Sequence, residues 1–428
     1  MRKILFWALV CLCSFPSAAM TVVGGSPYVA GAVAASGLEQ VYVFNGMTGA
    51  ALSHDSDNPA ACRWYRYTHA FDDAVELSAP DITQTSTATV LGNLSADCGY
   101  FVVDGAQRHA VYVIDYQLHP CQYAALVPVT EAEDITESLQ VIVSGCADDL
   151  AYRGLDGRTY YLNRKHTFQY VDLEWDAAAN DYRSKPVSLE REGYLSSISV
   201  EAPLDNTVFE LSGDQFAEYF GLARTSVTTA YTAVKVVTHA QALVVEKEKG
   251  DNEVGGGASG LTGPAPLEVN FLSQVNPPTT HTIWYIYTTP GSTDTYLYRN
   301  ETDINYVFNQ AGSFTVKLKA SNAVSSDSAS FIVTVTESFL DCPNFFTPRS
   351  TPGENDEFKV AYRSLVKFHG RIMNRWGNVL FEWRDPALGW DGTWHGRPVN
   401  PGVYFYVVTA TGSDGIEYVR KGDINLLE

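Results

Sequence analysis

The residues best suited to metal chemistry form one short segment, His54-Asp55-Ser56-Asp57. Imidazole nitrogens and carboxylate oxygens are common metal ligands. Gly, Ser, Asn and Asp residues surround this segment, and such residues favour turns. The sequence therefore favours a solvated loop over a metal site. His109 and His119 flank an expected strand and have no evident ligand partners in the sequence.

Paired carboxylates, which can share a proton in acid–base catalysis, occur at Asp72-Asp73 and Asp148-Asp149. Neighbouring residues on a strand point to opposite faces of the sheet, so neither pair is suited to a shared site. Glu174 and Asp176 would share a face, but the acidic composition makes such coincidences common. The sequence has no G-x-S-x-G, H-E-x-x-H, P-loop, G-x-G-x-x-G or C-x-x-C motif. We therefore expect no catalytic residues, no cofactor and no enzymatic activity.

Aromatic side chains suggest a binding surface. Tyr65 and Tyr67 alternate with Arg66 on an expected strand, and Tyr160 and Tyr161 follow a turn. Sugars stack on exposed rings, so a glycan or host-matrix ligand is one interpretation. A second interpretation is that the rings cover a sandwich core or a domain junction. The sequence favours this second interpretation, because aromatic side chains dominate core packing.

The N-terminus has the features of a secretory signal peptide. Arg2-Lys3 precedes an apolar stretch at residues 4–15, and small residues follow at 17–19. The apolar stretch is too short to span a bilayer. We expect a signal peptide at residues 1–19 and an exported mature chain.

Five cysteines follow this leader: Cys62, Cys98, Cys121, Cys146 and Cys342. In an exported chain they can form two disulfides with one thiol left over. Pairing of nearest neighbours predicts Cys62–Cys98 and Cys121–Cys146, although the sequence leaves the connectivity open.

Composition narrows the partners and the fold class. The 428-residue chain has a formal net charge of −20, with 25 Tyr and 20 Phe against 4 Met. Nucleic acids and anionic lipid surfaces bind clustered Lys and Arg, so the acidic balance argues against both. Aromatic and β-branched runs favour strands. We expect an all-β protein that binds no nucleic acid.

Short strands separated by turn residues are the elements expected to position these side chains. In residues 20–128, period-two alternation places Cys62 and Trp64 on one face of a strand, which is typical of an Ig-like sandwich. Residues 129–247 predict a second β-sandwich, with helical turns at residues 214–222. Expected strands lie at residues 40–44, 62–67, 98–103, 110–116, 139–143, 159–162, 166–175, 195–200, 207–211 and 231–238.

A charged, glycine-rich linker is expected at residues 248–263, followed by a third domain at residues 264–336. Residues 306–316 contain Tyr-x-Phe and then Ala-Gly-x-Phe-Thr-Val, and Trp284 is expected on a strand. This segment resembles the PKD domain, although the W-x-F-G-D-G motif of that family is absent. The resemblance implies another Ig-like sandwich.

The C-terminal part of the chain carries six ordered sequence blocks. They read PNFFTP (343–348), NDEF (355–358), IMNRWG (372–377), GWDG (389–392), PGVYFY (401–406) and KGDI (421–424). This order resembles the gliding-motility-associated C-terminal domain, the type B sorting signal of type IX secretion. The resemblance implies a β-sandwich sorting domain at residues 337–428. It also implies an extracellular location at the cell surface, in association with the outer membrane.

Several residues of the sorting domain have an expected structural role. Glycines 377, 392 and 402 fit tight turns, in which Asn374 and Asp391 are expected to form hydrogen bonds. A small core is expected around Trp376, Trp390 and Phe405. The terminal strand at residues 424–427 is a candidate free edge to which a partner could add a strand.

The resemblance implies two partners, the type IX outer-membrane translocon and a PorP/SprF-type anchor protein. Arg375, Lys421 and Gly422 are the residues most expected to touch such a partner. The full set of candidate recognition residues is Asn374, Arg375, Trp376, Gly377, Trp390, Asp391, Gly392, Gly402, Tyr404, Lys421 and Gly422.

Three functions follow from the sequence. The first is a non-enzymatic surface protein whose N-terminal sandwiches act as adhesin, binding or stalk modules. The second is an accessory component of the gliding or type IX secretion apparatus, bound to a PorP/SprF-type outer-membrane protein. The third is an exported hydrolase, for which the sequence offers no catalytic set. We favour the first.

Overall fold

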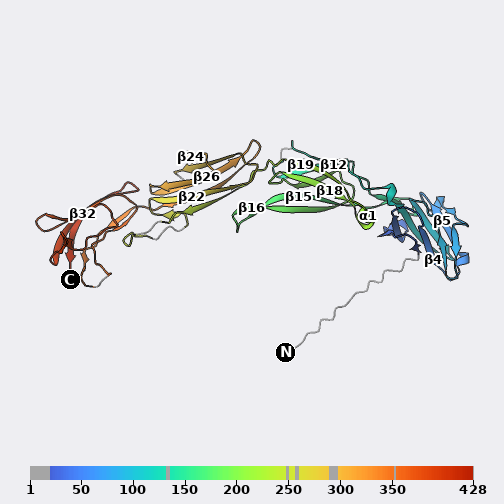
Figure 1. The fold of residues 1–428 in the computed structure, drawn as a ribbon, viewed down its shortest axis with the longest axis horizontal. Coiled ribbons are helices and arrows are strands. Elements are labelled where there is room, and N and C mark those ends of the chain that lie inside the picture. Colours follow the sequence, from blue (N-terminus) through green and yellow to red (C-terminus); the bar gives the residue numbers. More distant parts are fainter. Residues whose placement is uncertain are drawn as a thin grey trace, which may run out of the picture. The chain divides into compact units, whose positions relative to one another are not determined.

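The computed structural model describes residues 20–131, 135–246, 250–255, 260–288, 297–350 and 353–427. Strands dominate these residues (Figure 1), which confirms the expected all-β class. The chain divides into two compact units. Unit 1 comprises Met1–Asp172 and Ser184–Thr232, and unit 2 comprises Leu173–Arg183 and Ala233–Glu428. The expected signal peptide lies outside the described residues.

The first sandwich of unit 1 consists of two sheets around an aromatic core. Trp64, Tyr100 and Val102 are buried together, with Cys62 packed against them, as the alternation predicted. One sheet has the order β1 (Met20–Val23), β4 (Ala51–Asp55), β8 (Ala88–Leu91) and β7 (Ile82–Gln84). The other has the order β2 (Tyr28–Gly31), β3 (Gln40–Phe44), β10 (Gln107–Asp115), β9 (Cys98–Asp104), β5 (Arg63–Tyr67) and β6 (Val75–Glu76).

A second sandwich follows. One sheet has the order β11 (Ala125–Pro128), β12 (Ser138–Ser144) and β17 (Ser197–Glu201). The other has the order β16 (Asp181–Glu192), β15 (Lys165–Asp176), β18 (Thr207–Gly213) and β19 (Thr225–Tyr231), and a separate hairpin joins β13 (Leu150–Arg153) to β14 (Thr159–Leu162). The expected helical turns are present as α1 (Gln215–Tyr219), whose first N–H groups are capped by the Asp214 carboxylate.

A buried ion pair joins the two sandwiches of unit 1. Arg164 and Asp214 are 1% and 0% exposed, and the guanidinium of Arg164 binds the carboxylate of Asp214. Arg164 also donates to the carbonyl of His119, at 2.7 Å, and Asp214 accepts from the Tyr116 hydroxyl, at 2.9 Å. Because Tyr116 and Phe216 share one core cluster, the two sandwiches pack as one body.

The expected strand at residues 231–238 is wrong. Strand β19 ends at Tyr231, and the next strand, β20, begins at Thr238. Side chains of unit 2 bind the backbone between them: the Asn322 amide donates to the carbonyl of residue 234, and the Asn276 amide binds at residues 235 and 237. These side chains replace the hydrogen bonds that a strand partner would supply.

The third sandwich lies in unit 2. Its core surrounds Trp284, which is fully buried and donates its indole N–H to the carbonyl of Thr302 at 3.0 Å. One sheet has the order β20 (Thr238–Val244), β22 (Leu267–Val275) and β25 (Ile304–Phe308). The other has the order β21 (Thr262–Gly263), β27 (Ser326–Val335), β26 (Gly312–Ser321), β23 (His281–Tyr287) and β24 (Leu297–Arg299).

The C-terminal domain is built on a five-stranded sheet. Its order is β29 (Phe345–Phe346), β36 (Glu417–Leu426), β35 (Gly402–Gly412), β31 (Leu365–Met373) and β32 (Val379–Trp383). Two short pairs complete the domain, β28 (Phe339–Asp341) with β30 (Ala361–Arg363) and β33 (Thr393–Trp394) with β34 (Arg397–Pro398). Phe346, Phe358, Trp390 and Ile424 form the centre of its core.

All five described cysteines are free thiols. The predicted Cys62–Cys98 bridge is wrong, because the antiparallel register of β5 and β9 pairs Arg63 with Val103 and Tyr67 with Gly99. The two cysteines therefore lie at opposite ends of the ladder, about 20 Å apart at the usual rise per residue, whereas a disulfide needs α-carbons within about 7 Å.

The second predicted pair behaves differently. Burial raises the pKa of Cys121 to about 11, and the nearby Cys146 thiol is a lesser cause of the same shift. The two thiols therefore interact electrostatically, and their pairing after export stays a prediction, which mass spectrometry of unreduced peptides would test.

Candidate functional site

The sheet of the C-terminal domain has one face on the core and one face open. Along β35, Val408 points inward and is fully buried, whereas Val403 and Phe405 point outward and are 47% and 42% exposed. The cross-strand register places Phe405 between Met373 of β31 and Asp423 of β36. Strand β35 therefore has apolar side chains on both faces. A strand with one face in water usually has polar side chains on that face.

A shallow hollow of about 390 Å³ lies on this outward face. Met373, Phe405 and Val407 supply apolar surface, and Lys421 and Asp423 supply one charge of each sign. We call these five residues the outward patch. Gly422 also lines the hollow, and a β-carbon there would lie 2.9 Å from the Tyr406 hydroxyl oxygen. The strand therefore has little room for a larger residue at this position.

A tight turn beside the outward patch presents a tryptophan to solvent. The Asn374 side-chain oxygen accepts the N–H groups of Trp376 and Asn378, both at 3.0 Å, and Gly377 has φ +82°. Trp376 is 77% exposed. The guanidinium carbon of Arg375 lies 5.4 Å from the centre of the indole ring, in a cation–π contact. Trp and Arg are among the residue types enriched at the energetic centres of protein interfaces.

The second tryptophan motif is structural. Trp390 is fully buried and donates its indole N–H to the carbonyl of Thr393 at 2.7 Å. Asp391 accepts the backbone N–H and hydroxyl of Thr393, and Gly392 has φ +75°. Tyr404 packs edge-on against the Trp390 ring, with centres 5.2 Å apart. These contacts hold the domain together.

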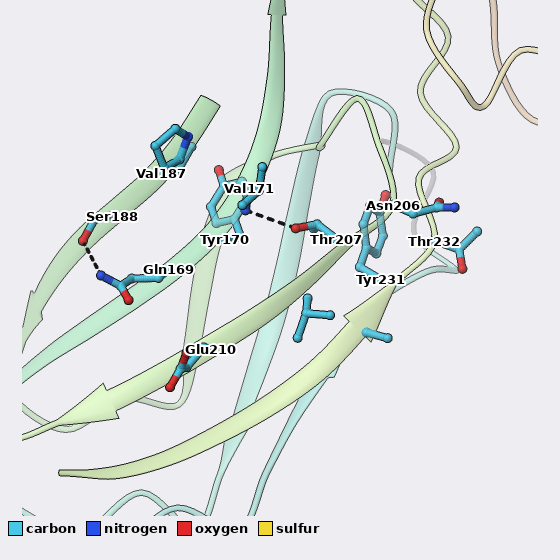
Figure 2. A pocket seen from close by; sticks show the side chains of 13 residues that line it. Gln169, Tyr170, Val171, Val187, Ser188, Asn206, Thr207, Glu210, Tyr231 and Thr232 are labelled. Carbon is cyan, nitrogen blue, oxygen red and sulfur yellow. Dashed lines mark hydrogen bonds between the residues drawn. The ribbon is translucent and has the colours of Figure 1, made fainter. Parts of the chain in front are cut away.

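Unit 1 has a larger hollow, of about 810 Å³, over the sheet of β16, β15, β18 and β19 (Figure 2). Val171 and Val208 lie on its surface and are 52% and 57% exposed. The Tyr231 hydroxyl is buried without a hydrogen-bond partner among the described residues, and its burial raises the pKa of this phenol. Polar lining comes from Gln169, Ser188, Asn206, Thr207, Glu210 and Thr232.

The chemistry of this hollow suits binding. Figure 2 shows the Gln169 amide donating to the Ser188 hydroxyl, at 3.3 Å, and the Val171 N–H donating to Thr207. Amides and hydroxyls recognise a neutral polar group, and the valines cover an apolar one. The lining has one carboxylate, that of Glu210, and contains no His, Cys or Lys.

Comparison with protein families identifies three parts of the chain. The CHU_C type IX secretion signal domain matches residues 340–426. The C-terminal domain is a type IX secretion signal domain. The PKD domain matches residues 256–335, and the fibronectin type III domain matches residues 128–229. The expected resemblances to a sorting domain and a PKD domain are confirmed.

Two solved structures are similar to the chain in a looser sense. The Sidekick-1 immunoglobulin domains 1–5 share 11% identity, with 94% of this chain and 77% of that chain covered and a TM-score of 0.25. Dimeric latent PorU from Porphyromonas gingivalis shares 11% identity, with 72% and 32% covered and a TM-score of 0.16. At these scores neither likeness carries an argument. The comparison with curated proteins gave no match.

The signal domain corrects two expected core residues. Trp376 and Phe405 are exposed, and only Trp390 of the expected trio is buried. Trp376 leaves the core because the Asn374 turn ends β31 before the ring is reached. Phe405 points outward because it alternates with Tyr404 and Tyr406. The period of two was visible in the sequence, but both faces of the strand are apolar, so it did not reveal which face is buried.

The expected free edge of the signal domain is also wrong. Strand β29 pairs in parallel with Asn425 and Leu426, and the N–H of Leu427 donates to the carbonyl of Phe346 at 3.1 Å. Residues 424–427 are therefore already covered. Among the predicted contact residues, Arg375 and Lys421 lie at the surface, and Gly422 is half-buried. Their role in recognition stays a prediction.

Two other expectations concern unit 1. Tyr67 is buried and donates to the carbonyl of Arg153 at 2.9 Å, and Tyr160 stacks on Tyr152, so these rings cover a domain junction, as the sequence favoured. Tyr161 is 57% exposed. The solvated loop expected around His54 is wrong, because His54 lies on β4 and is 3% exposed.

No helix in the part of the chain that the structure describes has the length and apolar character needed to cross a membrane. The type IX secretion signal domain implies export to the cell surface. Its accompanying Ig-like, fibronectin type III and PKD domains are typically non-catalytic. The domain content supports a cell-surface protein exported by type IX secretion.

Proposed function

We propose that the protein is a non-enzymatic surface protein that is retained at the outer membrane through its signal domain, while unit 1 binds a ligand. The observation that supports retention is the outward patch, an apolar surface with one charge of each sign, beside the exposed pair Arg375 and Trp376. Burial of apolar area is the main driving force of association, and paired charges at its rim favour one orientation of the partner.

The proposed partner is the outer-membrane part of the type IX machinery, either the translocon or a PorP/SprF-type anchor. Trp376 inserts into a pocket of the partner, and the outward patch covers the area next to it. Trp390, Asp391 and Gly392 act indirectly, because they support the fold that presents this surface.

The proposed ligand site of unit 1 is the hollow in Figure 2. The exposed valines and the ring of amides and hydroxyls support a glycan or a matrix protein as the ligand class. A glycan array and a matrix-protein panel probed with the purified protein test this assignment. Val208→Lys should abolish a signal that the wild-type protein gives.

The decisive experiment follows surface display in a host with type IX secretion. A chain that ends at Glu337 should stay off the surface, as measured by protease shaving of whole cells. Trp376→Ala should also lower display, because it removes the proposed contact with the partner. The domain should still fold, since this ring is exposed and contributes little to the core. Trp394→Ala is the matched control, since this ring is 47% exposed elsewhere in the same domain. Equal display of both variants and the wild type would exclude the proposed surface.

A further inference from the structure

Three different metal-ligating side chains converge at one end of the first sandwich. His54 lies on β4, Cys62 directly precedes β5, and Asp104 ends β9. One ligand atom from each of the three lies within 4.8 Å of the other two. The register of β5 and β9 brings Cys62 opposite Asp104, and His54 comes from the other sheet. The cluster therefore connects the two layers of the sandwich.

The spacing of the ligand atoms fits a tetrahedral ion. Zinc lies about 2.0–2.1 Å from nitrogen or oxygen ligands and about 2.3 Å from sulfur, so its ligand atoms are about 3.3–3.6 Å apart. His54 Nε2 and Asp104 Oδ2 are 3.2 Å apart. Cys62 is only half-buried and lies outside the strand ladder, and its sulfur lies within 4.8 Å of both atoms.

Neighbouring side chains hold the three proposed ligands in place. The Asp104 carboxylate accepts hydrogen bonds from Ser56 and His54. The His109 ring stacks on His54 with centres 5.1 Å apart, and its Nδ1 lies 2.6 Å from a carboxylate oxygen of Glu39. The stacked His109 ring, itself held by Glu39, restricts rotation of the His54 imidazole.

We propose that His54, Cys62 and Asp104 form a zinc site that fastens the two sheets of the first sandwich. One imidazole, one thiolate and one carboxylate form a mixed donor set that suits a borderline ion, whereas Mg²⁺ and Ca²⁺ prefer oxygen alone. Cys62 loses its proton on binding, and water fills the fourth position. The site gives a role to a half-buried thiol that the register keeps away from Cys98.

Cobalt titration of the metal-free mature chain tests the site, because Co²⁺ replaces Zn²⁺ and is coloured. We expect one Co²⁺ per chain, visible d–d bands of a tetrahedral ion and a near-ultraviolet thiolate-to-cobalt band. Added Zn²⁺ should bleach all of them. Zinc should also raise the thermal midpoint, since it binds the folded state alone.

Cys62→Ser should abolish the thiolate band and weaken zinc binding at least tenfold. Cys342→Ser is the matched control, because this thiol is half-buried in the signal domain and lies outside the cluster. Asp104→Asn keeps the size of the side chain and should also weaken binding, which guards against a folding defect in a single variant. A thiolate band that survives in Cys62→Ser, or the lack of any stoichiometric band in the wild type, would overturn the site.

Discussion

At the residue scale, the most consequential contact is the ion pair of Arg164 and Asp214. Both side chains are removed from water, and each has further hydrogen-bond partners that satisfy its remaining polar atoms. A buried charge is tolerated only when it is paired in this way. The adjacent Lys165 forms an ion pair with Glu192 at 3.3 Å, with both side chains more than half exposed. The two pairs should contribute very differently to stability.

Asp214→Asn should lower the free energy of unfolding of unit 1 by about 3–5 kcal/mol, because the Arg164 charge is left buried and uncompensated. Urea unfolding followed by tryptophan fluorescence measures this loss. Lys165→Met is the control and should cost less than about 1 kcal/mol, since exposed pairs contribute little. If Asp214→Asn cost no more than the control, the ion pair would not fasten the two sandwiches.

His166 predicts a dependence of stability on pH. The side chain is 1% exposed, and burial lowers its pKa below the ordinary value of 6.5. Between that value and the lower folded-state pKa, the unfolded chain binds more protons than the folded chain, so stability rises with pH. The free energy of unfolding of unit 1 should therefore decrease as the pH falls below about 6.5.

Urea unfolding between pH 5 and pH 8 measures this dependence, and His166→Gln should flatten it. His239 in unit 2 also has a pKa lowered by burial and contributes with the same sign. The unfolding of unit 1 and of unit 2 must therefore be followed by separate signals. An unchanged slope in His166→Gln would assign the dependence to other groups.

At the element scale, strand register determines which residues meet. Strands at residues 40–44 and 159–162 could be predicted from the sequence to the residue, because runs of β-branched and aromatic residues end at turn residues there. The cluster of His54, Cys62 and Asp104 could not, since it requires the pairing of β5 with β9 and the approach of a second sheet. Local sequence patterns reveal neither which strands pair nor which sheets pack together.

The same register explains the glycine near the start of β9. Gly99 pairs with Tyr67, and a β-carbon at residue 99 would lie 1.9 Å from the ring of that buried tyrosine. Gly99→Ala should therefore destabilise unit 1 by about 1–3 kcal/mol, as overpacked cores do. Gly31→Ala, on β2, has open space around its β-carbon position and should be neutral or stabilising. Thermal unfolding compares the two, and equal midpoints would contradict the steric argument.

At the scale of the whole molecule, function is divided along the chain. The six C-terminal sequence blocks were enough to predict a sorting domain, because their glycines and tryptophans occupy fixed places in its turns and core. The surface that a partner would recognise was not predictable, since Phe405 and Trp376 resemble core residues in the sequence. Hydrophobic character alone does not separate a core from an interface.

Fusion of the signal domain to an unrelated carrier protein tests whether this domain alone directs surface display. Residues 337–428 fused to a periplasmic carrier should bring that carrier to the surface of a type IX host, as measured by antibody labelling of whole cells. Combined Arg375→Ala and Trp376→Ala substitutions in the fusion should reduce labelling severalfold, while Trp394→Ala should not. Equal labelling of all three fusions would place recognition elsewhere in the domain.

Strand β36 lies between β29 and β35, and it contributes Ile424 and Leu426 to the core of the signal domain. It is also the last strand of that domain to be synthesised. A polypeptide whose translation stops before residue 417 lacks the strand that joins two others, and it cannot complete the domain. The core of the signal domain is therefore completed only after every described domain that precedes it has been made, and we expect chains truncated before residue 417 to lack the folded surface proposed for recognition.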